Sequence, residues 1–368
     1  MTQGHSLKEG SVKKIFVFLL VAAVGTCAVL MNMACNANAP SSPNLQSPVQ
    51  TISAANPTLT FTPTNTLTFT PTITNTPTNT GTPTPFVTEV PWTGFSSPNG
   101  VAVYNGVNGG VYVADTGHNL LKKFNFNGFL ATNWGNGGKG KGAVSFLSPQ
   151  GVAVDNGGNL YVVGGESKVV KYDTMGNLIP QFVSMSFTNP KSVAVDGSGN
   201  IYVSDPTNDR IVQLTSGGSL GSGFGGSGTL TISPVAPASQ AIPYGIAVDR
   251  NGNVAAAASD NNIHYYAVNG SVIATIPGYQ INPTAFDFNN GSGLTWGSIA
   301  FDSGNNLFVA DAGYHQVEEF ANWGLNLSPI DIFNNNGTLN SPAGVVVDAN
   351  GNIYVTDSVN NNVVVFAP

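Results

Sequence analysis

One sequence unit, present six times between Ser97 and Phe366, constrains the fold of this chain more than any other feature. In outline it reads P-x-G-V-A-V-D-x-x-G-N-I-Y-V-x-D, followed by an aliphatic and then an aromatic residue. The copies begin at Gly100, Gly151, Ser192, Gly245, Gly297 and Gly344. Short apolar runs inside a repeat of about 40 to 50 residues are typical of folds in which equal units lie side by side.

The apolar runs in each copy predict short β-strands joined by tight turns. They are rich in Val, Ile, Tyr and Phe and are bounded by Asn-Gly, Gly-Asn or Ser-Gly pairs. Asn and Gly suit such turns because they tolerate positive φ. Both faces of the runs are apolar, so each sheet must be covered on both sides. We therefore predict an all-β fold, a six-bladed β-propeller of four-stranded antiparallel blades.

A fourth strand is expected after the third run of five copies, where a Gly turn precedes an apolar stretch. These stretches are Gly128–Leu130, Gly176–Leu178, Gly218–Leu220, Gly270–Val272 and Gly324–Leu327. The sixth copy ends at Pro368 without one. Upstream of the first copy, Phe86–Trp92 resembles Phe129–Trp134 in pattern and exit residue. We predict that this N-terminal segment supplies the outer strand of the last blade and so closes the ring.

These units resemble NHL repeats, and the resemblance covers residues 97–366. Four copies carry an acidic residue at the end of the second run: Asp115, Asp205, Asp311 and Asp357. In the alignment of the copies, Val163 and Ala257 take that place in the second and fourth. The first copy has Tyr104 where the others end their inner strand in Asp. These departures argue against six equivalent sites but leave the predicted fold unchanged.

The region before the repeats indicates export. Lys8, Lys13 and Lys14 precede an uncharged apolar run, the order found in secretory signals, and residues 1–35 are interpreted as a signal peptide or membrane anchor. Cys35 and Cys27 are candidates for lipidation, and an uncleaved anchor or ordinary secretion stays open. Residues 36–85, rich in Thr, Pro and Asn, predict a disordered, semi-stiff spacer before the propeller at 86–368. Localisation is expected in the cell envelope or outside the cell.

The charge of the chain limits which classes of partner it can bind. Only 8% of residues are charged, the net charge is −7, and the pI is about 4.9. Nucleic-acid binding needs a basic patch, so we expect no nucleic acid. From Asn251 to Pro368 there is no Lys or Arg. The partner is expected to be a protein, peptide or carbohydrate, the membrane to be contacted through the N-terminus only, and the propeller to be monomeric.

Candidate binding residues lie in the loops after the second strands. In a propeller these loops open on the same face as the blade-to-blade connections, so equivalent positions form a ring at the channel mouth. Such polar side chains could hydrogen-bond a sugar, a peptide or another small polar ligand. A simpler interpretation, which we favour for most of them, is that they cap turns. The positions are His118, Asn119, Glu166, Ser167, Asn208, Asp209, Asp260, Asn261, Tyr314, His315, Asn360 and Asn361.

Two functional hypotheses follow. The favoured one is a non-catalytic binding or sensing module, with no catalytic residues and no cofactor. The alternative is a metal-assisted lyase or hydrolase, because six-bladed relatives include peptidyl-amidating lyases and gluconolactonase-like hydrolases. His118, His264 and His315 fall at unlike places in their repeats, so we predict no histidine zinc site. Calcium held by Asp205, Asp209, Asp311 or Asp357 is the remaining metal prediction.

Overall fold

A computed structural model describes residues 87–88, 91–131, 134, 143–180, 182, 184–234, 240–277, 297–321, 329–334 and 337–368. All of them belong to the second of two units into which the chain divides, Thr78–Pro368. The predicted signal or anchor, the acylation of Cys27 or Cys35, and the spacer at 36–85 lie outside the described residues. No helix within the described part is long and apolar enough to cross a membrane.

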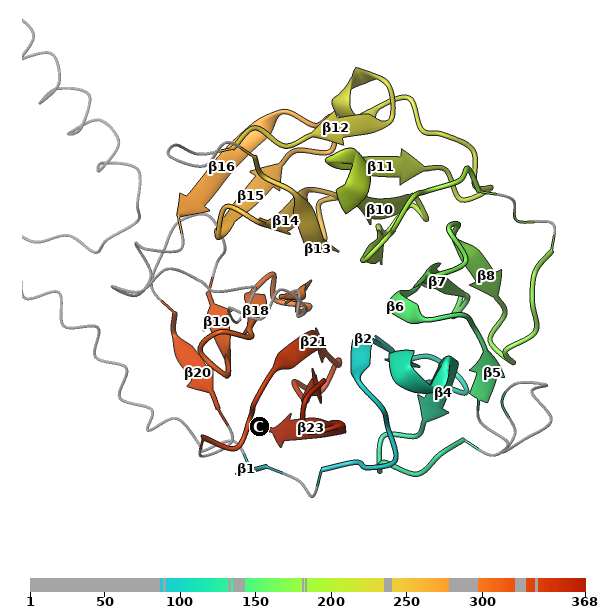
Figure 1. Cartoon of the computed structure of the whole chain (residues 1–368), viewed down its shortest axis with the longest axis vertical. Coiled ribbons are helices and arrows are strands. Elements are labelled where there is room, and N and C mark those ends of the chain that lie inside the picture. The colour runs from blue at the N-terminus through green and yellow to red at the C-terminus, as the bar shows by residue number, and fades with distance from the viewer. Residues whose placement is uncertain are drawn as a thin grey trace, which may run out of the picture. The chain divides into compact units, whose positions relative to one another are not determined.

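The described strands form six antiparallel sheets arranged as the blades of a ring, which confirms the predicted propeller (Figure 1). Blade 1 contains β2 (Pro98–Tyr104), β3 (Gly110–Asp115), β4 (Leu120–Phe124) and β5 (Ala143–Ser145). Blade 2 contains β6 (Pro149–Val154), β7 (Leu160–Gly164) and β8 (Val170–Tyr172). Blade 3 contains β9 (Val193–Val195), β10 (Ile201–Asp205), β11 (Arg210–Leu214) and β12 (Thr229–Thr231).

The remaining blades follow the same order from the ring axis outward. Blade 4 contains β13 (Pro243–Val248), β14 (Val254–Ala258), β15 (Asn262–Tyr266) and β16 (Val272–Pro277). Blade 5 contains β17 (Ile299–Phe301), β18 (Leu307–Asp311), β19 (Gln316–Phe320) and β20 (Asp331–Phe333). Blade 6 contains β21 (Pro342–Val347), β22 (Ile353–Asp357) and β23 (Asn362–Ala367), and its fourth strand is β1 (Val87–Thr88).

The apolar core lies between blades rather than in one central mass. One cluster joins Tyr112 and Leu121 of blade 1 to Val152 and Leu160 of blade 2, and a similar cluster fills each of the other junctions. Burying both faces of every sheet in this way is the main stabilising term of the fold. It also explains why the sequence shows apolar residues on both sides of the second strands.

The glycine of P-x-G allows the inner strands to come close around the axis. A Cβ atom on Gly100 would lie 2.5 Å from the carbonyl oxygen of Gln150 in the next blade. On Gly151 it would lie 2.8 Å from the carbonyl oxygen of Lys191. A side chain at either place would push neighbouring blades apart, so the residue before this glycine is held at a fixed position beside its counterpart in the next blade.

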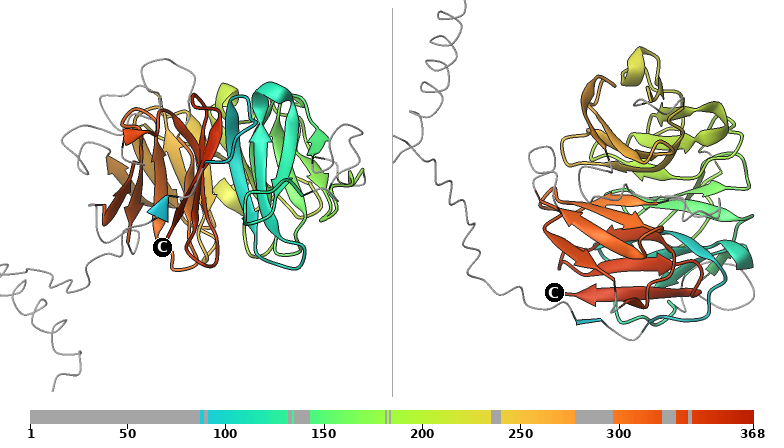
Figure 2. Two further views of the ribbon diagram at one scale, coloured as in Figure 1. Left: turned by 90° about the horizontal axis from the view of Figure 1, so that it is seen from below. Right: turned by 60° about the vertical axis from the view of Figure 1, so that its left-hand side comes forward.

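The N-terminal closure is confirmed. Val87 pairs with Ala367 and Thr88 with Phe366, and β1 lies beside β23 in two views of the ring (Figures 1 and 2). Further along, the Trp92 N–H donates to the Val363 carbonyl at 2.8 Å. Trp92 packs on Tyr354 with ring centroids 5.6 Å apart, and Trp134 packs on Tyr112 at the same distance. The similarity of the two sequence segments therefore reflects equivalent places in two blades.

The outer strands correct one prediction. Leu130, Leu178 and Leu220 each form only an isolated bridge to the third strand, whereas the regular outer strands β5 and β12 begin further along the chain. Blade 2 was predicted to have four strands, but its described residues form a sheet of three. In blade 3 the interruption holds Phe224, which packs edge-on against Tyr202 at 5.3 Å. Extra residues thus leave the sheet to bury an aromatic ring and then return. The predicted strand at Gly270–Val272 leads into β16, and Gly324–Leu327 lies outside the described residues.

Strand register also corrects the alignment of the copies. Pro98 pairs with Asp115 and Pro342 with Asp357, while Pro149 pairs with Gly164 and Pro243 with Ala258. The residues equivalent to the acidic position are therefore Gly164 and Ala258, not Val163 and Ala257. The difference matters because a shift of one residue turns a side chain to the opposite face of a strand.

Candidate functional site

The rim loops share one backbone feature. The second residue of every predicted pair adopts a left-handed conformation, with φ between 51° and 58°. Asn and Asp tolerate this region better than most residues, and four of the six positions carry them. These observations support the interpretation that the residues shape turns. The six are Asn119, Ser167, Asp209, Asn261, His315 and Asn361.

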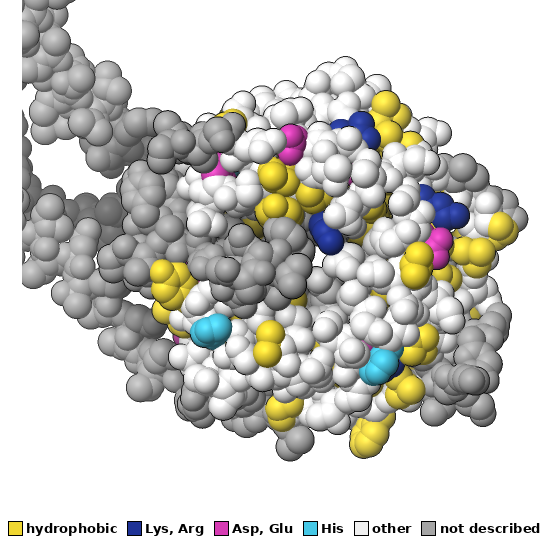
Figure 3. All heavy atoms as spheres, viewed as in Figure 1, with side chains coloured by type: hydrophobic (Ala, Val, Ile, Leu, Met, Phe, Trp, Pro, Cys, Tyr) yellow, Lys and Arg dark blue, Asp and Glu magenta, His cyan; other side chains and the backbone are white. Residues whose placement is uncertain are grey.

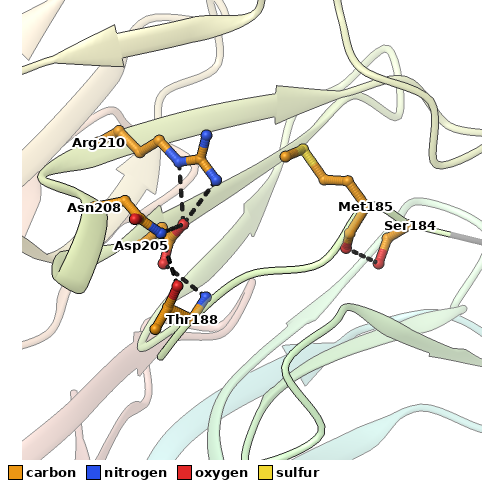
Figure 4. Close-up of polar contacts among 6 residues, drawn as sticks. All are labelled: Ser184, Met185, Thr188, Asp205, Asn208 and Arg210. Carbon is orange, nitrogen blue, oxygen red and sulfur yellow. Dashed lines mark hydrogen bonds and ion pairs between the residues drawn. The ribbon is translucent and has the colours of Figure 1, made fainter.

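Buried aspartates fasten the same loops to the incoming connections. In Figure 4, Arg210, Asn208 and Thr188 all point toward Asp205. The Arg210 guanidinium donates to Asp205 Oδ2 at 3.0 Å, Asn208 Nδ2 donates to the same oxygen at 2.7 Å, and the Thr188 N–H donates to Oδ1 at 3.2 Å. Asp205 is fully buried, so these bonds satisfy a carboxylate that has no access to water.

The corresponding aspartates of blades 1 and 6 act in the same way. Asp115 accepts from the Ser96 N–H at 2.7 Å and lies 2.5 Å from Lys122 Nζ. Asp357 accepts from the Asn340 N–H at 2.7 Å and from Asn360 Nδ2 at 2.8 Å. Bonds of this kind organise the rim.

Several rim side chains also link one blade to the next. Asn119 Oδ1 accepts from the Ser148 N–H at 2.8 Å, and Asn361 Oδ1 accepts from the Ser97 N–H at 2.7 Å. Asp209 Oδ2 accepts from Gln240 Nε2 at 2.8 Å. The Gly313 and Tyr314 N–H groups donate to Asp311, while Glu166 is exposed. The loops thus share a face, and a ligand-binding role for them stays a prediction.

The three histidines of the repeats lie in different environments. His264 is 2% exposed in β15, with Nε2 3.0 Å from Asp260 Oδ2. His118 is exposed and its Nδ1 lies 2.8 Å from Asp115 Oδ2, whereas His315 is exposed in blade 5. Histidine side chains are far apart on the face drawn in Figure 3. Among the described residues, no group of three or more His, Cys, Asp or Glu is arranged to hold a metal. The calcium prediction stays a prediction.

A polar ring that the sequence analysis missed surrounds the channel mouth. Each of its members follows the proline that precedes an inner strand or begins it. Together with Ser192 and Ser298 they line a small cavity. Asn99 Nδ2 donates to Gln150 Oε1 at 3.0 Å across the first two blades. Below the ring, a cavity of about 330 Å³ follows the largely apolar inner strands. The described polar members are Asn99, Gln150, Lys191 and Tyr244, and Ala343 takes this position in blade 6.

Burial gives this mouth its electrostatic character. Loss of water lowers the pKa of Lys191. Burial raises the pKa of Tyr244, and the negative charge of Asp209 raises it further. The face seen in Figure 3 is largely covered by neutral groups, with few charged side chains. The mouth therefore combines neutral hydrogen-bonding groups with one partly desolvated amine, an arrangement suited to orienting a polar ligand.

Comparison with known proteins places the fold. Residues 339–366 match the NHL repeat family, which confirms the predicted resemblance for the last repeat. No curated protein matches the sequence. Virginiamycin B lyase from Staphylococcus aureus is similar in structure, with 12% identity over 77% of this chain and 99% of that one, at a TM-score of 0.51.

Two further solved structures are similar over most of the propeller. A gluconolactonase from Xanthomonas campestris has 12% identity over 77% of this chain and 96% of its own, at a TM-score of 0.52. A protein described as a putative gluconolactonase has 15% identity over 75% and 89%, at a TM-score of 0.53. At these identities the likeness shows the six-bladed fold alone.

Proposed function

We propose that this protein is an exported propeller that binds a polar ligand, a peptide or a carbohydrate, at the mouth of its central channel without transforming it. The observation that carries the proposal is the convergence of Asn99, Gln150, Lys191 and Tyr244 on one small cavity. Binding sites commonly orient a ligand through a few polar groups placed around a depression, and these four side chains are such groups.

The backbone that carries Lys191 and Tyr244 is held in place before any ligand arrives. The main chain of Tyr244 is held by the Ser204 hydroxyl, which donates to its carbonyl at 2.7 Å. The Lys191 N–H donates to the Ser204 carbonyl at 3.2 Å. A site built on such rigid strands loses little conformational entropy on binding, which favours recognition. The sequence supports export, since the basic and apolar order before residue 35 is that of a secretory signal.

The test is a binding screen of peptide and glycan libraries with the full-length protein. Ligands found in this way should bind the Lys191→Met variant about tenfold more weakly, because a charge-assisted hydrogen bond is lost. Tyr244→Phe should cost less. Lys168→Met is the matched control, since Lys168 is an exposed lysine in the neighbouring blade. Equal binding by the wild type and both mouth variants would contradict the proposal.

Metal analysis separates this function from the metal-assisted lyase or hydrolase. The purified protein is assayed for bound divalent ions, and its melting temperature is measured with and without EDTA. A binding module of the proposed kind should be indifferent to EDTA. A stoichiometric ion whose removal lowers the melting temperature would favour the enzymatic alternative.

A further inference from the structure

Blade 1 lacks a carboxylate that other blades use to satisfy a buried tyrosine. In blades 2 and 6 the Tyr161 and Tyr354 hydroxyls donate to Asp155 and Asp348, each at 3.1 Å. In blade 4, where Ala255 replaces the tyrosine, its strand partner Tyr265 donates to Asp249 at 2.5 Å instead. The hydroxyl–carboxylate contact is therefore kept even when the tyrosine moves to another strand.

Blade 1 keeps the tyrosine and loses the acid. Tyr112 is 0% exposed, and Tyr104 stands where the other inner strands end in Asp. The Tyr112 hydroxyl has no hydrogen-bond partner among the described residues. Trp134, 2% exposed and 5.6 Å from the Tyr112 ring, has an indole N–H that is likewise unpartnered within the described part of the chain. Leaving a buried polar group unpaired costs roughly 1–3 kcal/mol, so each such donor needs an explanation.

A buried cation accompanies these donors. Lys123 is 5% exposed, pairs with Tyr112 across the strands, and holds Nζ 5.1 Å from the centre of the tyrosine ring. Burial lowers the pKa of this lysine. Its ammonium group donates to the Asn108 carbonyl at 2.5 Å, which leaves two further protons to donate.

Lys123 and Trp134 line a pocket of about 440 Å³ on the face opposite the channel mouth. The pocket lies among the β2–β3 turn, the turn after β4 and the turn after β8, at the ends of strands away from the rim loops. Leu130 and Met175 add apolar surface, and Asn125 adds an amide. None of its described lining residues is an Asp or Glu. The volume falls within the range of about 300–1,000 Å³ typical of small-molecule sites.

We propose that this blade 1 pocket binds a small organic carboxylate with an apolar body. The ligand carboxylate would accept from Lys123 Nζ and the Trp134 indole N–H, two buried donors for which the described part of blade 1 offers no carboxylate. Its apolar body would pack on Leu130 and Met175. The pocket should prefer a negatively charged ligand, because the side chains of its buried residues Lys123 and Trp134 can only donate hydrogen bonds.

Blade 2 provides an internal control. Lys171 pairs with Tyr161 just as Lys123 pairs with Tyr112, and its Nζ lies 4.8 Å from the Tyr161 ring centre. The Tyr161 hydroxyl, however, already donates to Asp155. The two lysines share strand position and aromatic neighbour and differ in whether the blade supplies its own carboxylate.

The test uses the full-length protein with 3-phenylpropionate and octanoate as probes and the corresponding amides as neutral controls. Isothermal titration calorimetry should show binding of the acids and at least about tenfold weaker binding of the amides. In a proton–nitrogen spectrum the indole N–H signal of Trp134, identified with Trp134→Phe, should move on adding acid. No binding of either acid, or equal binding of acid and amide, would overturn the proposal.

Variants locate the site. Lys123→Met should weaken acid binding about tenfold, while Lys171→Met should leave it unchanged. If Lys123→Met fails to fold, the shift of the Trp134 signal in the wild type still tests the proposal. An unmoved Trp134 signal in the wild type, or an equal loss in Lys171→Met, would place any binding elsewhere and refute the proposal.

Discussion

Blades 1 and 5 carry opposite charges at the same place in the fold. Lys122 lies opposite Val113 in blade 1, and Glu318 lies opposite Val309 in blade 5, so the two are structural equivalents. Lys122 forms an ion pair with Asp115, whereas Glu318 is 2% exposed and feels the like charge of Asp311. The two blades have the same strand pairing at this place. Strand register and apolar packing therefore determine the blade's structure, while the side chain at this position determines how the blade's stability depends on pH.

The largest expected effect comes from breaking the ion pair of blade 1. Asp115→Asn removes the charge that compensates Lys122, whose side chain is only 14% exposed. We expect the free energy of unfolding to fall by about 3 kcal/mol, measured by urea denaturation, because a buried charge loses its partner. The double variant Asp115→Asn with Lys122→Met should lose less than the sum of the single variants. A single variant as stable as the wild type would show that the pair is not needed.

The second largest expected effect is on the pH dependence of stability and comes from Glu318 in blade 5. Burial, and then the charge of Asp311, raises the pKa of Glu318 from 4.5 to about 7. The folded protein therefore holds a proton that the unfolded chain releases, and this group makes the free energy of unfolding fall as pH rises from 4.5 to 7. Glu318→Gln should remove that decline and make the protein more stable than the wild type at pH 8, by on the order of 2 kcal/mol.

The measurement compares urea denaturation of the wild type and Glu318→Gln at pH 5 and pH 8. Lys168→Met, at an exposed lysine, is the control and should leave the slope between these pH values unchanged. If Glu318→Gln has the same pH slope as the wild type, the two blades do not differ in the way described.

The smallest effect concerns the neighbouring residue of the same strand. Burial raises the pKa of Glu319 to about 7, with further contributions from Asp302 and Asp331. Glu319 is partly exposed and accepts from Asn306 Nδ2 at 3.2 Å. Glu319→Gln should therefore change the stability between pH 5 and pH 8 in the same direction as Glu318→Gln but by less, since water screens the charge. If Glu319→Gln changed the stability between pH 5 and pH 8 more than Glu318→Gln does, Glu319 would be the main source of the pH dependence.

The repeat pattern predicted the fold because each part of it has a local physical cause. Val and Tyr runs between Asn-Gly turns specify strands, and the resemblance of Phe86–Trp92 to Phe129–Trp134 located the closing strand. The polar ring at the mouth was missed because its residues all follow a proline at a position that varies from copy to copy, and a variable position looks uninformative when the copies are aligned. They are Asn99, Gln150, Lys191 and Tyr244. Only the ring geometry turns these unlike residues toward one cavity.

One departure from the repeat pattern pointed to the blade 1 pocket, but the sequence alone did not show what it meant. Tyr104 in place of Asp was apparent in the sequence, yet its consequence for the Tyr112 hydroxyl depends on a contact between two strands. The outer strands were placed too early because nothing in the sequence fixes where an insertion leaves the sheet. The interruption of the outer strand near Phe224 is explained by the burial of the Phe224 ring on Tyr202. The repeat pattern does not predict this contact.

Closure by β1 has a mechanical consequence. The strand that completes blade 6 is also the part of the propeller that follows directly on the preceding chain. Tension applied to that chain would reach the ring first through the pairing of Val87 and Thr88 with β23, and next through the bonds between Trp92 and Val363. Blade 6 would then open at this junction before the other blades do. A pulling force would separate β1 from β23 and expose the edge of β23.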